Sequence, residues 1–206
     1  MTNTLKSLLC AAVLSLMFPV AGHCNQVVNG DFSAGTTNWT FTGSVVVANS
    51  AAYVGCCATG DTGTGNFAAF GGGDQPDNGQ ISQTFATVSG QEYSLTFLYG
   101  AFSSPAGVGT QSVTIASGDL NTTLTSPTSV RELGDVFSSY QYNFVAGAAT
   151  TTLTFADVST KTNSIDAFLD NVDVESVSSV PEPSSLGLLA IGFTSLSAFY
   201  RNRIRR

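Results

Sequence analysis

The sequence predicts an all-β protein built as an antiparallel β-sandwich, and three observations support this prediction. Apolar and polar residues alternate in short runs such as Tyr93–Tyr99 and Tyr140–Phe144, as expected for strands with one buried face. Turn-forming sequences such as Ser117-Gly118-Asp119 separate these runs. Between residues 25 and 178 no window keeps the 3.6-residue apolar period of an amphipathic helix. Many short strands at this spacing favour a sandwich.

Residues 1–24 have the three parts of a secretory signal peptide, which we expect to be helical. Lys6 supplies a positive charge, residues 8–20 are apolar, and Ala21-Gly22-His23-Cys24 closes the segment with mostly small residues. Cleavage after Gly22 and cleavage after Cys24 both suit the small-residue preference of signal peptidase. The Sec machinery and signal peptidase are therefore the expected partners during export.

The expected mature domain, residues 25–178, is strongly acidic and long enough to bury one hydrophobic core. It holds thirteen of the fourteen Asp and Glu residues and only two cations, Arg131 and Lys161, which gives a net charge of about −11. Such a charge repels nucleic acid and anionic lipid surfaces. We therefore expect no nucleic-acid partner.

Two loop regions follow from turn-forming and small residues. The sequence Ala146-Gly147-Ala148 lies between the strand patterns Tyr140–Val145 and Thr150–Phe155, and we expect it to join them as a hairpin. Residues 55–78 are rich in glycine but have no GKS or GKT sequence to bind phosphate. We expect that region to be a solvated loop.

Two adjacent cysteines, Cys56 and Cys57, lie in the glycine-rich region. An ordinary disulfide needs Cα atoms about 4.4–6.8 Å apart, which adjacent residues reach only in a strained ring. If cleavage follows Gly22, Cys24 is retained and can pair with one of them in an oxidising compartment. The other interpretation is a pair of loop thiols without a catalytic role.

The single histidine of the chain, His23, lies in the cleavage zone of the signal peptide. A mature domain without histidine has no Ser-His-Asp or Cys-His nucleophile system and no imidazole ligand for a catalytic zinc. A pair of carboxylates acting as acid and base remains an option. We expect a protein that is not an enzyme and has no catalytic residue.

Near the end of the domain, an acidic residue interrupts an apolar pattern. If Phe168, Val172 and Val174 share one face of a strand, Asp170 lies on that face as well. A carboxylate on an apolar face is costly unless it is paired, protonated or bound to a metal. Calcium takes carboxylate and carbonyl oxygens and is the natural ion for this position. The alternatives are a bulge that turns Asp170 to solvent and hydrogen bonds from turn amides.

The last segment, residues 179–206, contains three features in a fixed order. Val180-Pro181-Glu182-Pro183 forms a stiff extended joint, because proline fixes its own φ and disfavours helix in the residue before it. Residues 184–200 are predicted to be a transmembrane helix, although their apolar part is slightly shorter than the roughly 18–20 residues usually needed. A cationic stop follows, and it consists of Arg201, Arg203, Arg205 and Arg206.

This order resembles the PEP-CTERM sorting tail of Gram-negative bacteria that make exopolysaccharide. In that family a membrane protease of the exosortase type cuts near the Pro-Glu-Pro motif and releases or transfers the outer domain. The resemblance implies export across the inner membrane, transient anchoring, and a final place at the cell surface or in the extracellular matrix. An ordinary single-span anchor is the alternative.

The two ends of the central domain resemble the jelly-roll, galactose-binding-like domains that include several carbohydrate-binding modules. The opening residues 25–32 read NQVVNGDF and are followed by Trp39, and residues 168–174 read FLDNVDV. The resemblance implies that the first and last strands lie close together, with a structural calcium between them at Asp31 and Asp170. Ser33 stands where many relatives carry a glutamate ligand, which weakens that site. Trp39 is expected in the core.

These features predict an exported, non-catalytic surface or biofilm protein with a possible affinity for polysaccharide. Sugar-binding relatives use exposed aromatic residues, but no residue here can be singled out among Tyr99, Phe102, Tyr140 and Tyr142. A structural or adhesive protein is the alternative, including one that adheres to ice or mineral. For this function Thr150-Thr151-Thr152 and Thr154 offer only a fragment of a threonine-rich face. A glycan-active enzyme is a weaker alternative.

Overall fold

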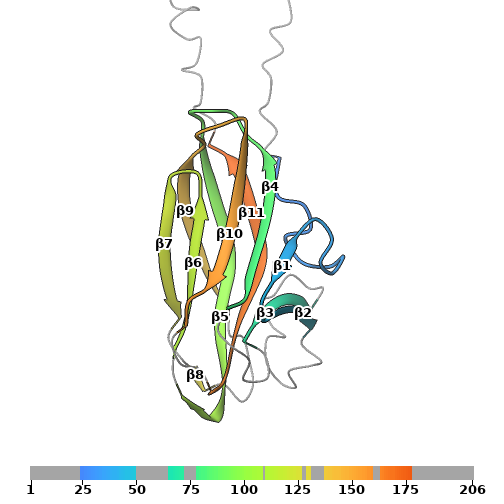
Figure 1. Cartoon of the computed structure of the whole chain (residues 1–206), viewed down its shortest axis with the longest axis vertical. Coiled ribbons are helices and arrows are strands. Elements are labelled where there is room, and N and C mark those ends of the chain that lie inside the picture. Colours follow the sequence, from blue (N-terminus) through green and yellow to red (C-terminus); the bar gives the residue numbers. More distant parts are fainter. Residues whose placement is uncertain are drawn as a thin grey trace, which may run out of the picture.

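The structure is a computed structural model that describes residues 24–49, 65–71, 78–108, 110–126, 129–130, 137–159 and 163–177. Within these ranges the chain forms β-strands arranged in two layers (Figure 1). The predicted signal-peptide helix and the predicted transmembrane helix at 184–200 lie outside them, except for Cys24. In the part of the chain that is described, no helix is long and apolar enough to cross a membrane.

The first sheet has five antiparallel strands whose pairing shows no register shift. Short β1 forms one edge and β7 forms the other, with β10 in the middle. In spatial order the strands are β1 (Thr40–Thr42), β4 (Gln80–Ala86), β10 (Thr150–Asp157), β6 (Gln111–Ser117) and β7 (Leu120–Ser126).

The second sheet is built around two long strands, β5 and β11, which pair antiparallel over most of their length. Their pairing shifts register twice, between Asn163 and Ile165 and between Asp170 and Asp173. The order is β2 (Val45–Asn49), β3 (Asn66–Phe70), β11 (Asn163–Ser176), β5 (Glu92–Val108) and β8 (Ser129–Val130), with β9 (Ser138–Val145) also paired to β5.

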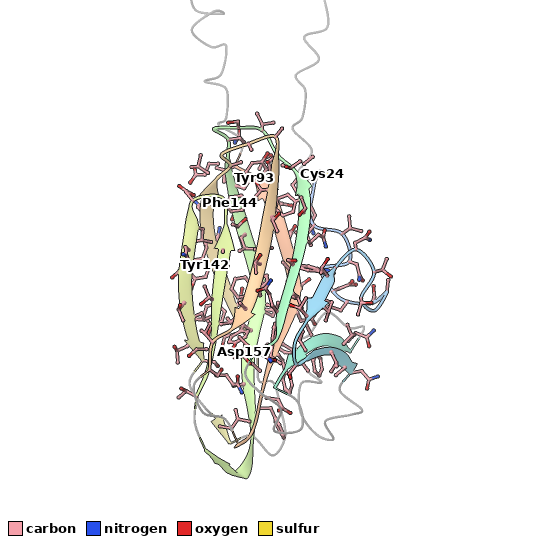
Figure 2. The ribbon with its side chains drawn as sticks, in the orientation of Figure 1. Cys24, Tyr93, Tyr142, Phe144 and Asp157 are labelled. Atoms are coloured by element: carbon pink, nitrogen blue, oxygen red, sulfur yellow. The ribbon has the colours of Figure 1, made fainter. Side chains whose placement is uncertain are left out.

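The main core fills the space between the sheets, and the predicted strand alternation builds it. On β5 every second residue from Tyr93 to Tyr99 is at most 3% exposed. The Phe97 ring meets Phe155 of the first sheet edge to face, with centroids 5.1 Å apart, and Tyr93 stacks on Phe144 at 5.4 Å (Figure 2). The prediction of an all-β antiparallel sandwich is confirmed.

The predicted hairpin between 140–145 and 150–155 is wrong, because β9 and β10 belong to different sheets. The connecting residues cross the end of the sandwich and bond to the connection between β4 and β5. The Ala146 amide donates to the Gln91 oxygen at 3.0 Å, and the Gly90 amide donates to the Ala146 oxygen at 2.7 Å. Ala146 is buried. A short connection that contains a buried residue can lead the chain into the other sheet as well as back along the same sheet.

A second, smaller apolar cluster lies on the outer side of the second sheet. Phe67 of β3 and Phe168 of β11 are fully buried there, with ring centroids 4.6 Å apart. Phe137, which precedes β9, meets both rings at 6.0 and 6.4 Å, and Phe102 stacks on Phe168 at 6.3 Å. This side of the second sheet is therefore partly covered.

Candidate functional site

Residues 25–30 of the opening segment bond to the end of the last strand, β11, and the segment then forms a loop that leads to β1 (blue in Figure 1). The Gln26 amide donates to the Val174 oxygen at 2.8 Å, and the Val172 amide donates to the Gly30 oxygen at 3.0 Å. The Asn25 side chain accepts a bond from the Val174 amide at 3.1 Å. The opening segment and the final strand are close together, as the jelly-roll resemblance implies.

Asn29 organises the loop of this segment. Its Nδ2 donates to the Gly35 and Thr37 oxygens at 2.9 Å each, and its Oδ1 accepts from the Ala34 amide at 2.9 Å. Its φ is +57°, a left-handed conformation that asparagine tolerates better than most residues. Trp39 is 7% exposed and its Nε1 donates to the Asn29 oxygen at 3.0 Å. The tryptophan is part of the core.

Gly30 and Asp31 lie where this loop meets β11. A Cβ atom on Gly30 would lie 1.9 Å from the Val172 oxygen, so only glycine fits there. The next residue, Asp31, is half-buried, and its Oδ1 accepts bonds from the Ser33 amide at 3.2 Å and from the Ser33 hydroxyl at 2.9 Å. Ser33, the departure from the family pattern, thus bonds to the carboxylate predicted to hold calcium.

Asp170 is fully buried, and its environment corrects the predicted face pattern. Asn171 has φ +51° and lies within the register shift of β11. This bulge reverses the alternation, so Phe168 and Asp170 face the outer side while Val172 and Val174 face the main core. The bulge leaves Asp170 buried, and its Oδ1 accepts a bond from the Asn171 amide at 2.7 Å.

The carboxylate oxygens of Asp31 and Asp170 are of the kind that calcium takes, and the calcium site at these two residues stays a prediction. Asp31 and Asp170 lie on adjoining segments, joined by the pairing of Gly30 with Val172. Asn66 of β3 adds an amide side chain whose Nδ2 donates to the Phe32 oxygen at 3.2 Å. Within the described ranges no three Asp, Glu, His or Cys side chains gather as a metal site. A calcium here would need carbonyl oxygens as well.

Only one cysteine falls within the described ranges, and the predicted bridge stays a prediction. Cys24 is exposed at the start of the described chain. Cys56 and Cys57 lie outside the described residues, as do the sorting motif Val180-Pro181-Glu182-Pro183 and the four terminal arginines.

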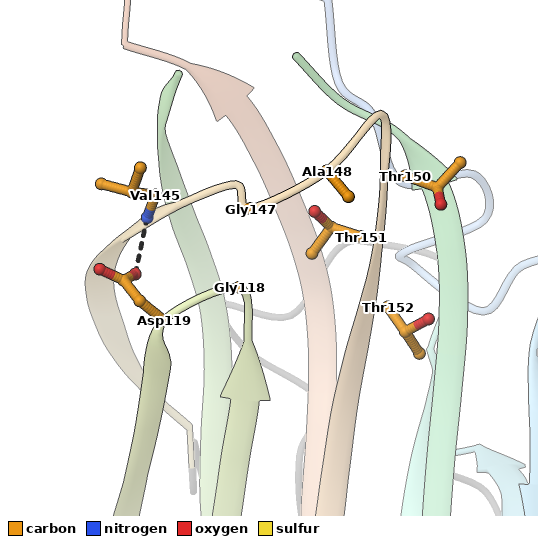
Figure 3. A pocket seen from close by; sticks show the side chains of 8 residues that line it. All are labelled: Gly118, Asp119, Val145, Gly147, Ala148, Thr150, Thr151 and Thr152. Atoms are coloured by element: carbon orange, nitrogen blue, oxygen red, sulfur yellow. Dashed lines mark hydrogen bonds between the residues drawn. The ribbon is translucent and has the colours of Figure 1, made fainter. Parts of the chain in front are cut away.

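A shallow, open cavity of about 360 Å³ lies at the end of the sandwich (Figure 3). Its walls come from the β6–β7 turn, from the crossover between β9 and β10, and from the start of β10. Asp119 lies at its mouth, and its Oδ1 accepts a bond from the Val145 amide at 2.7 Å. The other lining residues are Gly118, Gly147, Ala148, Thr150, Thr151 and Thr152. Hydroxyls and a fixed carboxylate can bond sugar hydroxyls.

The aromatic residues considered for sugar contact are mostly committed to packing. Tyr99 is buried, and burial raises the pKa of its hydroxyl well above 10.0, with a smaller contribution from Asp157. Tyr140 and Tyr142 are half-buried and stack on Phe97, with centroids 5.7 and 6.1 Å away. These two side chains line the inner side of β9 and remain partly accessible at that edge.

Carboxylates gather on the outer side of the second sheet. On β11, Asp173 and Glu175 lie on the same side, and Glu175 pairs with Ser94 of β5, two residues along that strand from Glu92. Burial raises the pKa of the Asp173 carboxyl, and the Glu175 charge adds to the effect, while the Val174 amide opposes it. We call this outer side the acidic face; its carboxylates are Glu92, Asp166, Asp170, Asp173 and Glu175.

Solved structures with the same fold include a carbohydrate-binding module and an enzyme. The carbohydrate-binding module TmCBM61, solved with β-1,4-galactotriose, matches with TM-score 0.53 and 12% identity, covering 73% of this chain and 97% of the module. The Stig cyclase Fisc from Fischerella sp. TAU matches with TM-score 0.51 and 13% identity, covering 75% and 98%. A family 16 carbohydrate-binding module matches with TM-score 0.45 and 18% identity, covering 73% and 99%. The first two similarities show a shared fold.

Sequence families identify the two parts of the chain. No curated protein sequence matches it. Residues 19–175 match the family described as a protein of unknown function, DUF642, and residues 179–206 match the PEP-CTERM protein-sorting motif. That motif marks a protein that is exported, anchored in a membrane and processed by an exosortase on its way to the cell surface. The chain belongs to the DUF642 family and carries a PEP-CTERM sorting tail.

Proposed function

We propose that this protein binds polysaccharide at the cell surface or in the extracellular matrix and catalyses no reaction. The observation that carries the proposal is the shared fold with TmCBM61, which the match covers almost completely and which was solved with a β-1,4-galactotriose. The sorting tail, which directs a protein to the cell surface, supports this proposal, because envelope polysaccharides are found there. Its acidic charge favours uncharged polysaccharides over acidic ones.

The end cavity at Asp119 is the proposed sugar site. Its volume falls within the range of small-molecule sites, and its walls offer the hydroxyls of Thr150 and Thr152 and one carboxylate. The bond from the Val145 amide fixes that carboxylate before a ligand arrives. A preorganised acceptor lowers the entropy lost on binding.

Retention of the full-length chain, solubilised in mild detergent, on immobilised β-1,4-galactan and on the exopolysaccharide of the host tests this function. We expect retention of the wild type and a clear loss for Asp119→Ala. Glu175→Gln removes a charge from the acidic face and serves as the matched control, which should be retained like the wild type. No retention of the wild type on either polymer would contradict sugar binding, and equal retention of both variants would contradict the site.

Catalysis is the second candidate, because the Stig cyclase shows that the same fold also supports an enzyme. A glycan-active protein would release reducing ends from a polysaccharide substrate. Loss of that release after a single carboxylate substitution would replace the non-catalytic proposal.

The proposed processing scheme removes residues 1–24 by signal peptidase and cuts near Pro181-Glu182-Pro183 in the tail. The mature domain would then span about residues 25–178. Intact mass of the protein recovered from its host, measured without reduction, tests both cuts and shows whether Cys24 is retained and bridged to Cys56 or Cys57. A mass that includes the leader and the terminal arginines would contradict this scheme.

A further inference from the structure

The outer side of the first sheet carries neither charged nor aromatic side chains on its five strands, although the domain around it is strongly acidic. We call it the threonine face. Its outward residues are Thr40, Thr42, Gln80, Ser82, Thr84, Ala86, Ser112, Thr114, Ala116, Asn121, Thr123, Thr125, Thr150, Thr152, Thr154 and Ala156. All of them are exposed or half-exposed.

Hydroxyl groups on this face bond to one another across neighbouring strands. The Oγ1 atoms of Thr84 and Thr152 lie 2.7 Å apart, and those of Thr114 and Thr123 lie 3.2 Å apart. The Ser112 Oγ atom makes the same kind of contact with the Oγ1 atom of Thr125 on β7, at 2.9 Å. These bonds fix rotamers that would otherwise vary, so that the hydroxyls and methyls keep defined positions.

The residues also form ranks that cross the whole sheet. One rank runs from Thr40 through Ser82 and Thr154 to Ala116 and Asn121. No register shift interrupts these pairings, so the array repeats about every 4.8 Å across the strands and about every 6.8 Å along them. The twist of about 20–25° per strand limits the most regular part to the central strands β4, β10 and β6.

A repeat in two dimensions suits a partner that is itself a repeating solid. Minerals are ionic, and their ions favour charged side chains such as carboxylates, which this face lacks. Crystalline polysaccharides present sugar rings that bind to aromatic platforms, which this face also lacks. Ice is an uncharged lattice of hydrogen-bond donors and acceptors, and a threonine hydroxyl can both donate and accept.

We propose that the threonine face binds ice, with Thr84, Thr152 and Thr154 at the centre of the contact. The hydroxyls replace water positions at the lattice surface, and the adjacent methyl groups fill the spaces between them. This activity uses the outer side of β4, β10 and β6. Thr150 and Thr152 of this face also line the end cavity, but contact with ice needs no sugar bound there.

Slow growth of ice in a solution of the full-length chain, in detergent and beside a non-binding protein of similar size, tests the proposal. The measurement is the fraction of each protein that enters the ice. We expect the wild type to be enriched in ice and Thr152→Lys, which places a long cation in the centre of the face, to be excluded. Ser139→Lys puts the same side chain on an exposed position of β9 in the other sheet and should enter ice like the wild type.

Circular dichroism of both lysine variants checks that each is folded. Exclusion of the wild type from ice would overturn the proposal, and so would entry of Thr152→Lys to the same extent as the wild type. Equal loss in Ser139→Lys would show that added charge, and not the threonine face, decides the result. Exclusion from ice combined with retention on crystalline cellulose that Thr152→Lys loses and Asp119→Ala keeps would assign the face to a polysaccharide instead.

Discussion

The two outer faces of the sandwich cover the same core but differ in almost every other respect. The threonine face has unbroken strand pairing and only neutral side chains, most of them small. The acidic face has two register shifts and five carboxylates, and it carries a second apolar cluster around Phe168. The first sheet is therefore regular, whereas the second sheet has local irregularities and is partly covered by other residues.

The cause of the difference is the bulge at Asn171. It turns Val172 and Val174 toward the main core and leaves Phe168 and Asp170 on the outer side. A side chain such as Phe168 is stable outside only if other residues cover it, and Phe102 and Phe137 do so. The irregular strand thus needs a third layer, whereas the regular sheet needs none.

Of the changes that test this difference between the faces, removal of the Phe168 ring should have the largest effect on stability. Phe168→Ala empties the centre of the outer cluster, and we expect it to lower the free energy of unfolding by about 3–5 kcal/mol. Thr154→Ala, a truncation on the threonine face, should cost less than about 1 kcal/mol. Urea denaturation measures both. Similar losses in the two variants would contradict the difference between the faces.

Gly30→Ala tests the contact between the opening segment and the bulged strand. The added Cβ would lie 1.9 Å from the Val172 oxygen, so the segment must move, at a cost of about 3 kcal/mol. Gly147→Ala is the control, because its Cβ would meet nothing within 4 Å and the change should stay within about 1 kcal/mol. A melting temperature unchanged by Gly30→Ala would show that the junction is not tightly packed.

Calcium should stabilise the acidic side of the molecule if Asp31 and Asp170 hold it. At about 100 times Kd a ligand adds about 2.7 kcal/mol, which raises Tm by about 5–10 °C in a domain of this size. Thermal melts in calcium and in EDTA measure the shift. Asp170→Asn should abolish it and Glu175→Gln should keep it. Identical midpoints for the wild type in both buffers would remove calcium from the account.

The smallest expected effect concerns Asp173. Its pKa is raised in the folded state above the ordinary value of 3.8, so the folded protein binds this proton more tightly than the unfolded chain does. The resulting stability is present at low pH and is lost as pH rises through the folded pKa. Asp173→Asn should therefore lose less stability than the wild type over that rise, as measured by urea unfolding at a series of pH values. Parallel curves would contradict the shift.

Local patterns in the sequence predicted much of the fold. Alternation along Tyr93–Tyr99 places every second side chain in the core. The closeness of the two ends of the domain was implied by the family resemblance of the motifs around Asp31 and Asp170. The change of sheet after β9 was missed, because a short turn of small residues has the same sequence pattern in a hairpin and in a crossover between sheets. The bulge was missed because alternation was assumed to continue through Asn171.

The threonine face could not be predicted from the sequence, since its parts are far apart along the chain. Thr84 and Thr152 are separated by 68 residues, and only strand pairing brings their hydroxyls together. Taken alone, the alternating residues Thr150, Thr152 and Thr154 indicate only that one side of a single strand is polar. Register is the alignment of paired strands with one another, so the sequence of a single strand does not reveal it.

Both ends of the domain leave from one end of the sandwich. The Val177 amide donates to the Glu92 oxygen at 2.9 Å, and Cys24 lies at the same end (Figure 2). The matched sorting motif begins at residue 179, and an extended chain spans at most about 3.6 Å per residue. While the tail is anchored, the domain is attached to the membrane at this end alone, and the loops at the other end of the sandwich are the part of the fold farthest along the strands from the attachment point.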